Sequence, residues 1–274
     1  MQKRKVSLEE LKSIELDILQ NIHDFCESEN LTYFLSSGTL LGAIRHKGFI
    51  PWDDDADVMM PRPDYEKFIK LYKSENYILN YPGKKGYYQS IIKLAHKDTE
   101  LVQRIPLADK PIGIHVDILP LDGESDNINK FVDHETFLLK MRDYSLILRQ
   151  MRFNRLFDVF FSKRCFVDFL YYCYIRLIKK MSLKNIFSRI EQYAQKYSYE
   201  TSNYVGYITM SNYRYKQRHR KILFQSKELV EFEGRKFYAP NGWSEYLTNL
   251  FGDYMQLPPE ENRRSQHVWV AYWK

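Results

Sequence analysis

The sequence has 274 residues, of which 44% are apolar and 16% are aromatic, and its formal net charge at pH 7 is +6. A chain of this length and apolar content can bury a large core, which excludes a disordered or low-complexity protein. Three cysteines without a CxxC pair exclude a disulfide framework and a cysteine-based zinc site. No apolar run reaches the roughly 20 residues of a membrane-spanning helix, and the N-terminus has no apolar signal-peptide core, so we expect a cytoplasmic protein.

The first predicted element is a helix over residues 7–29. Ser7 and Glu10 have the spacing of a capping box, in which each side chain bonds the backbone N–H of the other residue. Apolar residues recur on one face at steps of three and four residues, at Leu11, Ile14, Ile18, Ile22 and Phe25. We therefore expect this face to cover the core.

A strand, a helix and a second strand are predicted next. LTYFL at residues 31–35 and ADVMM at residues 56–60 are typical of strands. Between them, SSGTLLGAIRHKG opens a helix that ends at Gly48. This order places the acidic run DDDAD directly at the start of the second strand.

Further helices and strands follow without a linker or an internal repeat. A helix over residues 61–74 begins with two prolines, a residue favoured in the first helical turn. SIIKLA at residues 90–95 and GIHVDILPL at residues 113–121 predict two more strands. Helical patterns dominate residues 129–197, so we expect any domain boundary at residues 122–129.

Four aspartates, Asp53, Asp54, Asp55 and Asp57, lie within five residues of one another. Like charges this close repel unless a cation binds between them. In a strand, residues two apart share a face, so we expect Asp55 and Asp57 to project together and Asp54 to face away. Two carboxylates placed in this way can share one or two divalent cations. A solvated acidic turn is the alternative.

A further carboxylate, Asp117, stands between Val116 and Ile118 in an otherwise apolar strand. Burial of an unpaired charge is costly, so Asp117 needs a partner. A metal ion shared with Asp55 and Asp57 would supply one, and an ion pair with an arginine or lysine is the alternative. Because these candidate ligands are oxygen donors without a Cys/His cluster, Mg²⁺ or Mn²⁺ is favoured over zinc.

The turn SSGT offers a site for an anion. Ser36 or Ser37 can cap the helix that begins near Gly38, and Gly38 lets the backbone approach a ligand closely. The free amides of a helix N-terminus favour an anion such as phosphate. A strand, a Gly-Ser/Thr turn with its helix, and then a strand that carries D-x-D is the order used by nucleotidyltransferase-fold enzymes.

The segment from Gly38 to Asp57, GTLLGAIRHKGFIPWDDDAD, closely resembles the signature of the LicD family. This nucleotidyltransferase-like family includes bacterial phosphocholine transferases and is related to the fukutin-type glycan phosphotransferases. The similarity extends through MPRPDYEKF, GIHVDILPLD and FGDYMQLPPEENRRSQH. It implies an α+β fold whose nucleotidyltransferase-like core, a small mixed sheet flanked by helices, occupies residues 1–125. A mainly helical elaboration over residues 126–274 would pack with this core as one unit.

The resemblance also implies an activity, the metal-dependent transfer of a phospho-substituent from a CDP-activated donor. The expected donor is CDP-choline, the acceptor is a sugar hydroxyl of a cell-surface glycan or its lipid-linked precursor, and CMP leaves. Asp55, Asp57 and Asp117 would be the catalytic and metal-binding residues, with Asp117 as a ligand or as the base. The residues also allow a CDP-ethanolamine, CDP-glycerol or CDP-ribitol donor, or a nucleotidyltransferase that uses an NTP. An inactive binding protein is a further alternative, against which the three intact aspartates argue.

The donor-binding residues implied by the same motifs lie at both ends of the chain. They are Ser37, Gly38, Thr39, Arg45, Lys47, Trp52 and His267. Arg45 and Lys47 could reach the donor phosphates, or they could complement the dipole of the helix that they end. Trp52 could stack on cytosine or anchor its turn. His267 belongs to the C-terminal motif and has no assigned role.

A basic segment from Arg142 to Arg189 holds eleven Lys and Arg residues against three acids. Its cations alternate with aromatic and aliphatic residues, a composition that favours a helix resting on an anionic membrane surface, here the inner face of the cytoplasmic membrane. A buried helix with a basic outer face is the alternative. A second basic cluster, RYKQRHRK, has no accompanying nucleic-acid motif, so we do not expect nucleic-acid binding.

Overall fold

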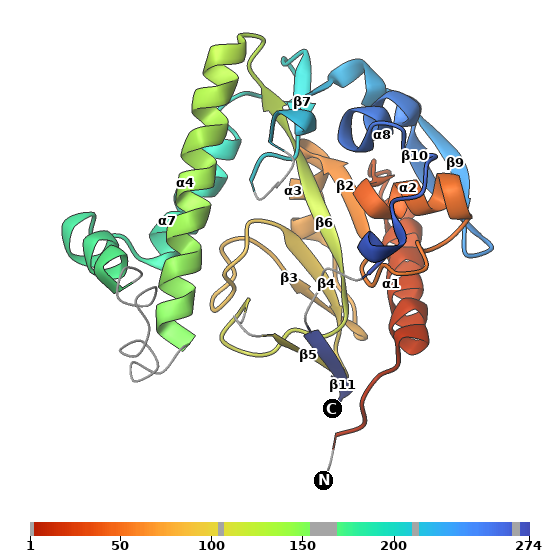
Figure 1. Ribbon diagram of the computed structural model, residues 1–274, viewed down its shortest axis with the longest axis horizontal. Helices are drawn as coiled ribbons and strands as arrows, with labels where there is room; N and C mark the ends of the chain where they lie inside the picture. The colour runs from red at the N-terminus through yellow and green to blue at the C-terminus, as the bar shows by residue number, and fades with distance from the viewer. Residues whose placement is uncertain (1–2, 104–106, 154–168, 210–213, 265–268) are drawn as a thin grey trace.

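The structure of the chain, a computed structural model, describes residues 3–103, 107–153, 169–209, 214–264 and 269–274. Its central sheet has the strand order β1-β2-β6-β4-β3, with β7 paired to β6 and β8 paired to β7 (Figure 1). These strands are β1 (Phe34–Leu35), β2 (Asp57–Pro61), β3 (Tyr77–Asn80), β4 (Ile92–His96), β6 (His115–Glu124), β7 (Tyr204–Gly206) and β8 (His219–Arg220). β2 and β6 run parallel and the other pairs antiparallel, which confirms an α+β fold with a mixed sheet. A nucleotidyltransferase-like core stays a prediction.

Helices surround this sheet. The longer ones are α1 (Leu8–Ser28), α2 (Ser37–His46), α3 (Arg62–Leu71), α4 (Ile128–Phe153), α7 (Leu183–Ala194) and α8 (Trp243–Phe251). The short ones are η1 (Tyr174–Ile178), η2 (Arg214–Gln217), η3 (Lys221–Phe224) and η4 (Glu260–Asn262). Within the described ranges, none of these helices has both the length and the apolar composition that a membrane crossing requires.

Helix α1 confirms the prediction for the N-terminal segment, including its capping box. The Ser7 hydroxyl accepts a hydrogen bond from the Glu10 N–H at 3.1 Å, and the Glu10 carboxylate accepts one from the Ser7 N–H at 3.0 Å. Helix α1 packs against β4 and β6. Its buried apolar residues are Leu11, Ile18, Leu19, Ile22 and Cys26.

Two clusters of buried apolar side chains hold the fold together. The larger one joins α1, α2, α3 and the central sheet to C-terminal residues such as Phe237 and Leu247. The second cluster lies mainly between α4 and α7 and includes Phe131, Leu148 and Ile186. Residues on both sides of position 125 thus share the larger core. The division of the chain into two units at this position stays a prediction.

The described part of residues 126–274 contains strands that the sequence pattern did not predict. They are β7, β8, β9 (Lys227–Phe232), β10 (Arg235–Pro240) and β11 (Trp269–Trp273), and β11 pairs with β5 (Thr99–Gln103). β7 and β8 have three and two residues, too few for an alternating pattern. β9 and β10 form a hairpin whose turn residues Glu233 and Gly234 both have positive φ. β9 has the sequence KELVEF, whose charged residues are typical of an edge strand. Because of these charges, β9 lacks the apolar pattern from which a strand is predicted.

A buried ion cluster links α3 to the sheet and to α7. The Arg62 guanidinium donates to both carboxylate oxygens of Asp122, at 2.6 and 2.8 Å, and to Glu191 at 3.2 Å and Glu66 at 3.3 Å. Three carboxyl groups therefore surround one cation. Burial, reinforced by Asp122 and Glu66 and opposed by Arg62, raises the pKa of Glu191 to about 7.

We predict that Glu191 makes the protein less stable as the pH rises from about 5 to about 8. The folded state keeps a proton on Glu191 up to a pKa of about 7, whereas the unfolded chain releases it near the usual value of 4.5. Because the folded state binds more protons in this window, raising the pH costs folding free energy, on the order of 2–3 kcal/mol in total. In Glu191→Gln, the fall in melting temperature across this range should be smaller.

The control variant is Glu75→Gln, which removes an exposed carboxyl from the loop after α3. Its melting temperature should follow the wild-type pH profile when thermal unfolding is monitored by circular dichroism. If Glu191→Gln also followed the wild-type profile, Glu191 would not hold the proton.

Candidate active site

A cavity of about 790 Å³ lies where β2 begins, between the sheet, the start of α2 and the C-terminal segment. Carboxyl groups dominate the polar part of its wall. They belong to Asp53, Asp55, Asp57, Asp117 and Asp253. The fold thus brings together acidic residues that are up to about two hundred positions apart in the chain.

The structure brings most of the predicted site residues to this one cavity. Those that line it are Asp55, Asp57, Asp117, Ser37, Gly38, Arg45 and Trp52. Thr39 and Lys47 are not part of the wall. His267 lies outside the described residues.

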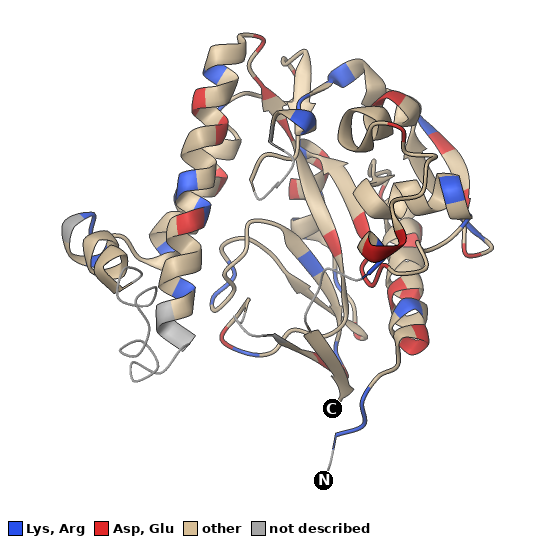
Figure 2. Ribbon diagram, viewed as in Figure 1, with Lys and Arg blue, Asp and Glu red and all other residues tan. Residues whose placement is uncertain are grey.

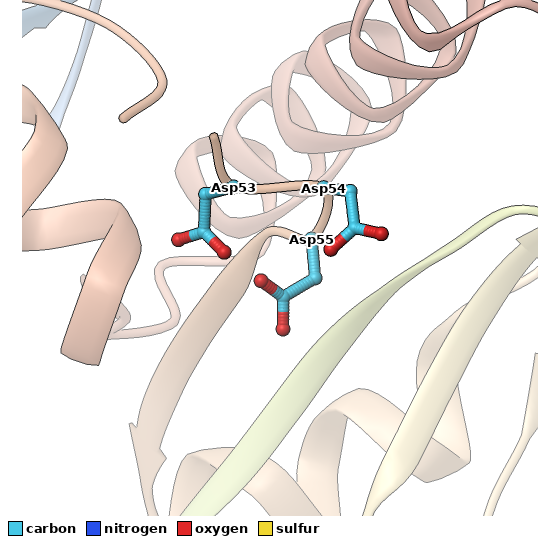
Figure 3. Close-up of side chains that lie close together, drawn as sticks. All are labelled: Asp53, Asp54 and Asp55. Carbon is cyan, nitrogen blue, oxygen red and sulfur yellow. The ribbon is translucent and has the colours of Figure 1, made fainter. Parts of the chain in front are cut away.

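The three consecutive aspartates Asp53, Asp54 and Asp55 form a tight carboxylate cluster in the loop before β2 (Figure 3). One carboxylate oxygen of each residue lies within 4.8 Å of those of the other two. β2 begins only at Asp57, so strand alternation does not govern this loop, and an Asp54 carboxylate oxygen lies close to those of its neighbours. As the alternation predicted, however, Asp55 and Asp57 line the cavity together and Asp54 does not. Asp54 is buried and outside the cavity wall, whereas Asp53 belongs to that wall, although the sequence did not assign it to the site.

Asp117 forms the ion pair that was the alternative to metal binding. It lies beside Asp57 in the parallel pair of β2 and β6, and beside Lys93 of β4 on its other side. The Lys93 ammonium lies 2.5 and 2.7 Å from the two Asp117 carboxylate oxygens. Figure 2 shows a basic position on β4 next to an acidic position on β6. The same ammonium donates to His115 Nε2 at 2.9 Å, because His115 Nδ1 donates to the Gly113 carbonyl at 2.8 Å.

The carboxyl groups around Asp57 raise its proton affinity. Burial and the negative charges of Asp55 and Asp117 raise the pKa of Asp57 well above its usual range, and Lys93 opposes the shift. Burial and the Asp117 and Asp57 charges likewise raise the pKa of Tyr207, another residue of the cavity wall. The site therefore has more negative charge than its lysine balances.

Glu15 is an acidic residue near the site that sequence reasoning missed. It lies on α1, is 2% exposed, and its Oε2 atom has no hydrogen-bond partner among the described residues. Burial, followed by the charges of Asp55 and Asp54, raises its pKa well above the usual range. Its position in the sequence could have identified it as a buried acid, because Glu15 falls within the apolar stripe of α1 between Leu11 and Ile18.

The start of α2 is built around Tyr246 of α8. Ser36 is the N-cap residue, but its hydroxyl does not cap the helix. Instead it lies 3.1 Å from the Tyr246 hydroxyl, which also accepts a hydrogen bond from the Ser37 N–H at 3.3 Å. The sequence predicted that Ser36 or Ser37 would cap this helix. Instead, a tyrosine more than two hundred residues away holds the turn in place.

Thr39 and Gly38 connect this turn to the aspartates. Thr39 lies behind the cavity wall, and its hydroxyl accepts a hydrogen bond from the Asp57 N–H at 2.8 Å. At Gly38 a Cβ atom would lie 2.8 Å from an Asp53 carboxylate oxygen. The absence of a side chain at Gly38 therefore allows the Asp53 carboxylate to lie close to the backbone of α2.

Arg45 and Trp52 contact the C-terminal segment beside the cavity. The Arg45 guanidinium donates to the Tyr254 carbonyl at 2.7 Å. The Arg263 guanidinium lies 5.8 Å from the centre of the Trp52 ring and donates to the Pro258 carbonyl at 2.8 Å. Both predicted donor-binding residues thus have structural contacts in addition to their place on the wall.

Lys47 ends α2 instead of reaching the cavity. Its backbone is left-handed, with φ 61°, and its carbonyl accepts a hydrogen bond from the Glu233 N–H at 2.8 Å. Glu233 in turn accepts a hydrogen bond from the Phe49 N–H at 2.9 Å. Through these two hydrogen bonds the β9–β10 hairpin holds the loop after α2 in place. Lys47 is the residue at which the helix ends.

Comparison with known proteins identifies the family. A family model described as LicD/FKTN/FKRP, nucleotidyltransferase domain, matches residues 30–157. Over 284 aligned residues the chain is 29% identical to the lipopolysaccharide cholinephosphotransferase LicD of Haemophilus influenzae, and the match covers 98% of this chain and 99% of that protein. The chain belongs to the LicD family. The domain match includes every aspartate of the site except Asp253.

Other relatives of this LicD-family protein share only part of its length. An uncharacterized protein of Rickettsia prowazekii is 28% identical over 150 residues, which cover 53% of each chain. An uncharacterized protein of Rickettsia typhi is 32% identical over 80 residues, which cover 28% of this chain and 26% of that protein.

We predict that Lys93→Met destabilises this LicD-family protein by on the order of 2–3 kcal/mol, because it leaves buried carboxylates without their counter-charge. The loss of melting temperature should be larger at about pH 8 than at about pH 5, since the carboxyl groups repel one another only when they are ionised. Lys97→Met is the matched control, because the Lys97 ammonium donates to the backbone carbonyl of Glu75 and not to a site residue. Equal losses at the two pH values would show that charge repulsion is not the cause.

Proposed function

We propose that this chain is a phosphotransferase that moves phosphocholine from CDP-choline to a sugar hydroxyl of a glycan or its lipid-linked precursor, with CMP as the leaving group. The observation that carries the proposal is the end-to-end similarity to an enzyme named as a lipopolysaccharide cholinephosphotransferase, over 98% of this chain and 99% of that protein. The cavity supports it, because carboxylates and helix-start amides lie together there.

The donor set of the cavity fits a divalent cation such as Mg²⁺ or Mn²⁺. Asp55, Asp57 and Asp117 offer only oxygen atoms, and Lys93 alone does not offset the repulsion that raises the pKa of Asp57. We assign these three aspartates as the residues that would hold the ion. When bound, a divalent cation would neutralise charge on the donor diphosphate and on the departing CMP.

The remaining wall residues suit the two halves of the donor. Ser37 and Gly38 place the start of α2 at the cavity, where the Gly38 amide can bind the diphosphate and the Ser37 amide donates to Tyr246. Trp52 offers a ring to the cytosine base, and Arg45 and Arg264 offer positive charge. Thr39 positions Asp57 through the backbone. We propose no donor contact for Lys47, whereas His267 remains a candidate from the sequence motif.

The test combines thermal unfolding with product analysis. With Mg²⁺, purified protein is given CDP-choline, CDP-ethanolamine, CDP-glycerol, CDP-ribitol or CTP. CDP-choline should raise the melting temperature most, because a ligand that binds only the folded state stabilises it. Acceptor-dependent release of CMP supports the phosphotransferase. Release of pyrophosphate from CTP would instead support a nucleotidyltransferase. If none of these ligands changed the melting temperature or was turned over, the inactive binding protein would be the remaining alternative.

We predict that Asp57→Asn lowers turnover by roughly two orders of magnitude or more, the effect of removing one stabilising group from a charged transition state. In the wild-type protein, Mg²⁺ and CDP-choline together should raise the melting temperature by more than the sum of their separate effects. This synergy should be lost in Asp57→Asn and kept in Asp24→Asn, which changes an exposed aspartate of α1. Additive shifts in the wild-type protein would mean that metal and donor do not share a site.

We further propose that the basic segment around η1 and α7 rests on an anionic membrane surface. From residue 169 to residue 190 the chain has five cations and no acidic residue. Leu170, Tyr171 and Leu177 are exposed there, Leu177 by 71%. The helical segment that contains η1 projects beside α4, and it carries Lys and Arg positions without Asp or Glu (Figures 1 and 2). Exposed apolar side chains among cations are typical of membrane-surface helices.

This proposal predicts sedimentation of the protein with anionic vesicles at low salt and its release as salt rises, since charges are screened beyond about 10 Å at 0.1 M. Changing Lys179, Lys180 and Lys184 together to Gln should weaken binding. The control changes three exposed lysines of α3 and its end, Lys67, Lys70 and Lys73, to Gln. Equal binding to neutral and anionic vesicles would reject the proposal.

A further inference from the structure

Asp253 lines the cavity from the C-terminal segment, away from the strands that carry the other acidic residues of the wall. Those residues belong to the loop before β2, to β2 itself and to β6. Asp253 is exposed, and its carboxylate has no hydrogen-bond or ion-pair partner among the described residues. This carboxylate is therefore available to a ligand in the cavity.

Helix α8 runs beside α2 and brings Asp253 to the end of α2 (Figure 1). Tyr246 of α8 contacts Ser37 at the start of α2, and Tyr254, eight residues later, accepts a hydrogen bond from Arg45 at 2.7 Å. Arg45 follows Ser37 by eight residues, which places it about 12 Å along the helix at a rise of 1.5 Å per residue. Asp253, next to Tyr254, is thus one helix length from the proposed diphosphate site.

Two turns hold the backbone of Asp253 in position. Gly252 ends α8 with φ 70°, a conformation that glycine adopts without strain, and its carbonyl accepts a hydrogen bond from the Tyr254 N–H at 2.9 Å. The Asp253 carbonyl accepts one from the Gln256 N–H at 3.2 Å, and the Gln256 carbonyl in turn lies 3.4 Å from the Arg45 guanidinium. Asp253 is therefore held at the cavity before a ligand binds, which lowers the entropy cost of binding.

The Trp52 ring belongs to the same part of the cavity wall. Its centre lies 6.2 Å from that of the His46 ring and 5.8 Å from the Arg263 guanidinium of the C-terminal segment. His46 Nε2 in turn accepts a hydrogen bond from Arg45 Nε at 3.0 Å. The Arg45 side chain thus contacts both the neighbour of Trp52 and the turn that contains Asp253, so an aromatic ring and a carboxylate line the cavity near the end of α2.

The two ends of the proposed donor differ in their distance from the diphosphate. An aromatic ring beside a carboxylate suits either the cytosine base or the choline ammonium. In CDP-choline the ribose separates the base from the diphosphate, whereas only a short ethylene chain joins the ammonium to its phosphate. Because Asp253 lies one helix length from the start of α2, its position fits the base better than the ammonium.

We propose that Asp253 accepts a hydrogen bond from the exocyclic amino group of cytosine and so selects cytidine over uridine nucleotides. This inference rests on the proposed function, which supplies the cytidine donor. Uracil carries a carbonyl oxygen where cytosine carries the amino group, and a carboxylate cannot donate a hydrogen bond to that oxygen. Asp253 would therefore favour one base and repel the other, while Trp52 stacks on either.

The experiment measures thermal stabilisation by nucleotides that carry no choline. With Mg²⁺, CDP should stabilise the wild-type protein at a concentration about tenfold or more below that required for UDP. In Asp253→Asn the amide can accept from cytosine or, after a half-turn, donate to uracil, so the preference for CDP should be lost. Glu261→Gln changes an exposed carboxyl of the same segment outside the cavity wall, and it should keep the wild-type preference.

Three results would overturn the inference. An equal response of the wild-type protein to CDP and UDP would show that no base is selected. Equal weakening of both nucleotides in Asp253→Asn would show that the carboxylate acts on the metal, the diphosphate or the fold. If the variant kept its preference for CDP but lost the additional stabilisation of CDP-choline over CDP, Asp253 would bind the ammonium.

The proposed function can fail independently of this inference, because nucleotide binding requires no group transfer. A wild-type protein that prefers CDP to UDP through Asp253, yet releases no CMP from CDP-choline with a glycan acceptor, would support the inference and contradict the proposed phosphocholine transfer.

Discussion

The spacing of carboxylates across adjacent strands is the constraint on which the site depends. The register of β2 and β6 fixes Asp57 next to Asp117, and the register of β4 and β6 fixes Lys93 on the other side of Asp117. These charges cannot move apart without breaking the sheet. With Asp53 and Asp55 added from the preceding loop, the cavity wall is strongly acidic. This acidity is the reason for the cation that we propose, because such a cation would offset the repulsion among the carboxylates and between them and a donor diphosphate.

Distant segments hold this charged region in place. Tyr246 of α8 fixes the turn before α2, the β9–β10 hairpin clamps the loop after α2 through Glu233, and Arg45 ties the end of α2 to Tyr254. The C-terminal segment thus closes a cavity whose acidic residues come mainly from the first half of the chain. The similarity to the Haemophilus influenzae enzyme spans both chains almost completely and so includes this C-terminal segment, which lies beyond the family's domain model at residues 30–157.

Buried charge is handled in two ways in this molecule. Around Arg62, three carboxyl groups share one guanidinium, so the buried cation is paired and links α3, β6 and α7. The Nε and Nη1 atoms of Arg149, by contrast, have no hydrogen-bond partner among the described residues. The first arrangement makes the stability of the fold depend on pH through the raised pKa of Glu191. The second is unfavourable for stability by itself.

The sequence by itself determined several local elements and three of the acidic residues that line the cavity. The capping box and apolar stripe of α1, the strand that carries Asp117 and the family motif around the aspartates all follow from short-range spacing, which physical rules and family resemblance both recognise. Only the tertiary structure decided the partners. The pairing of Asp117 with Lys93, the position of Asp54 beside Asp53 and the nearness of Glu15 depend on strand register and helix packing between distant segments. β7 and β8 have too few residues for a local pattern, and they form because β6 offers an edge to β7 and β7 offers one to β8.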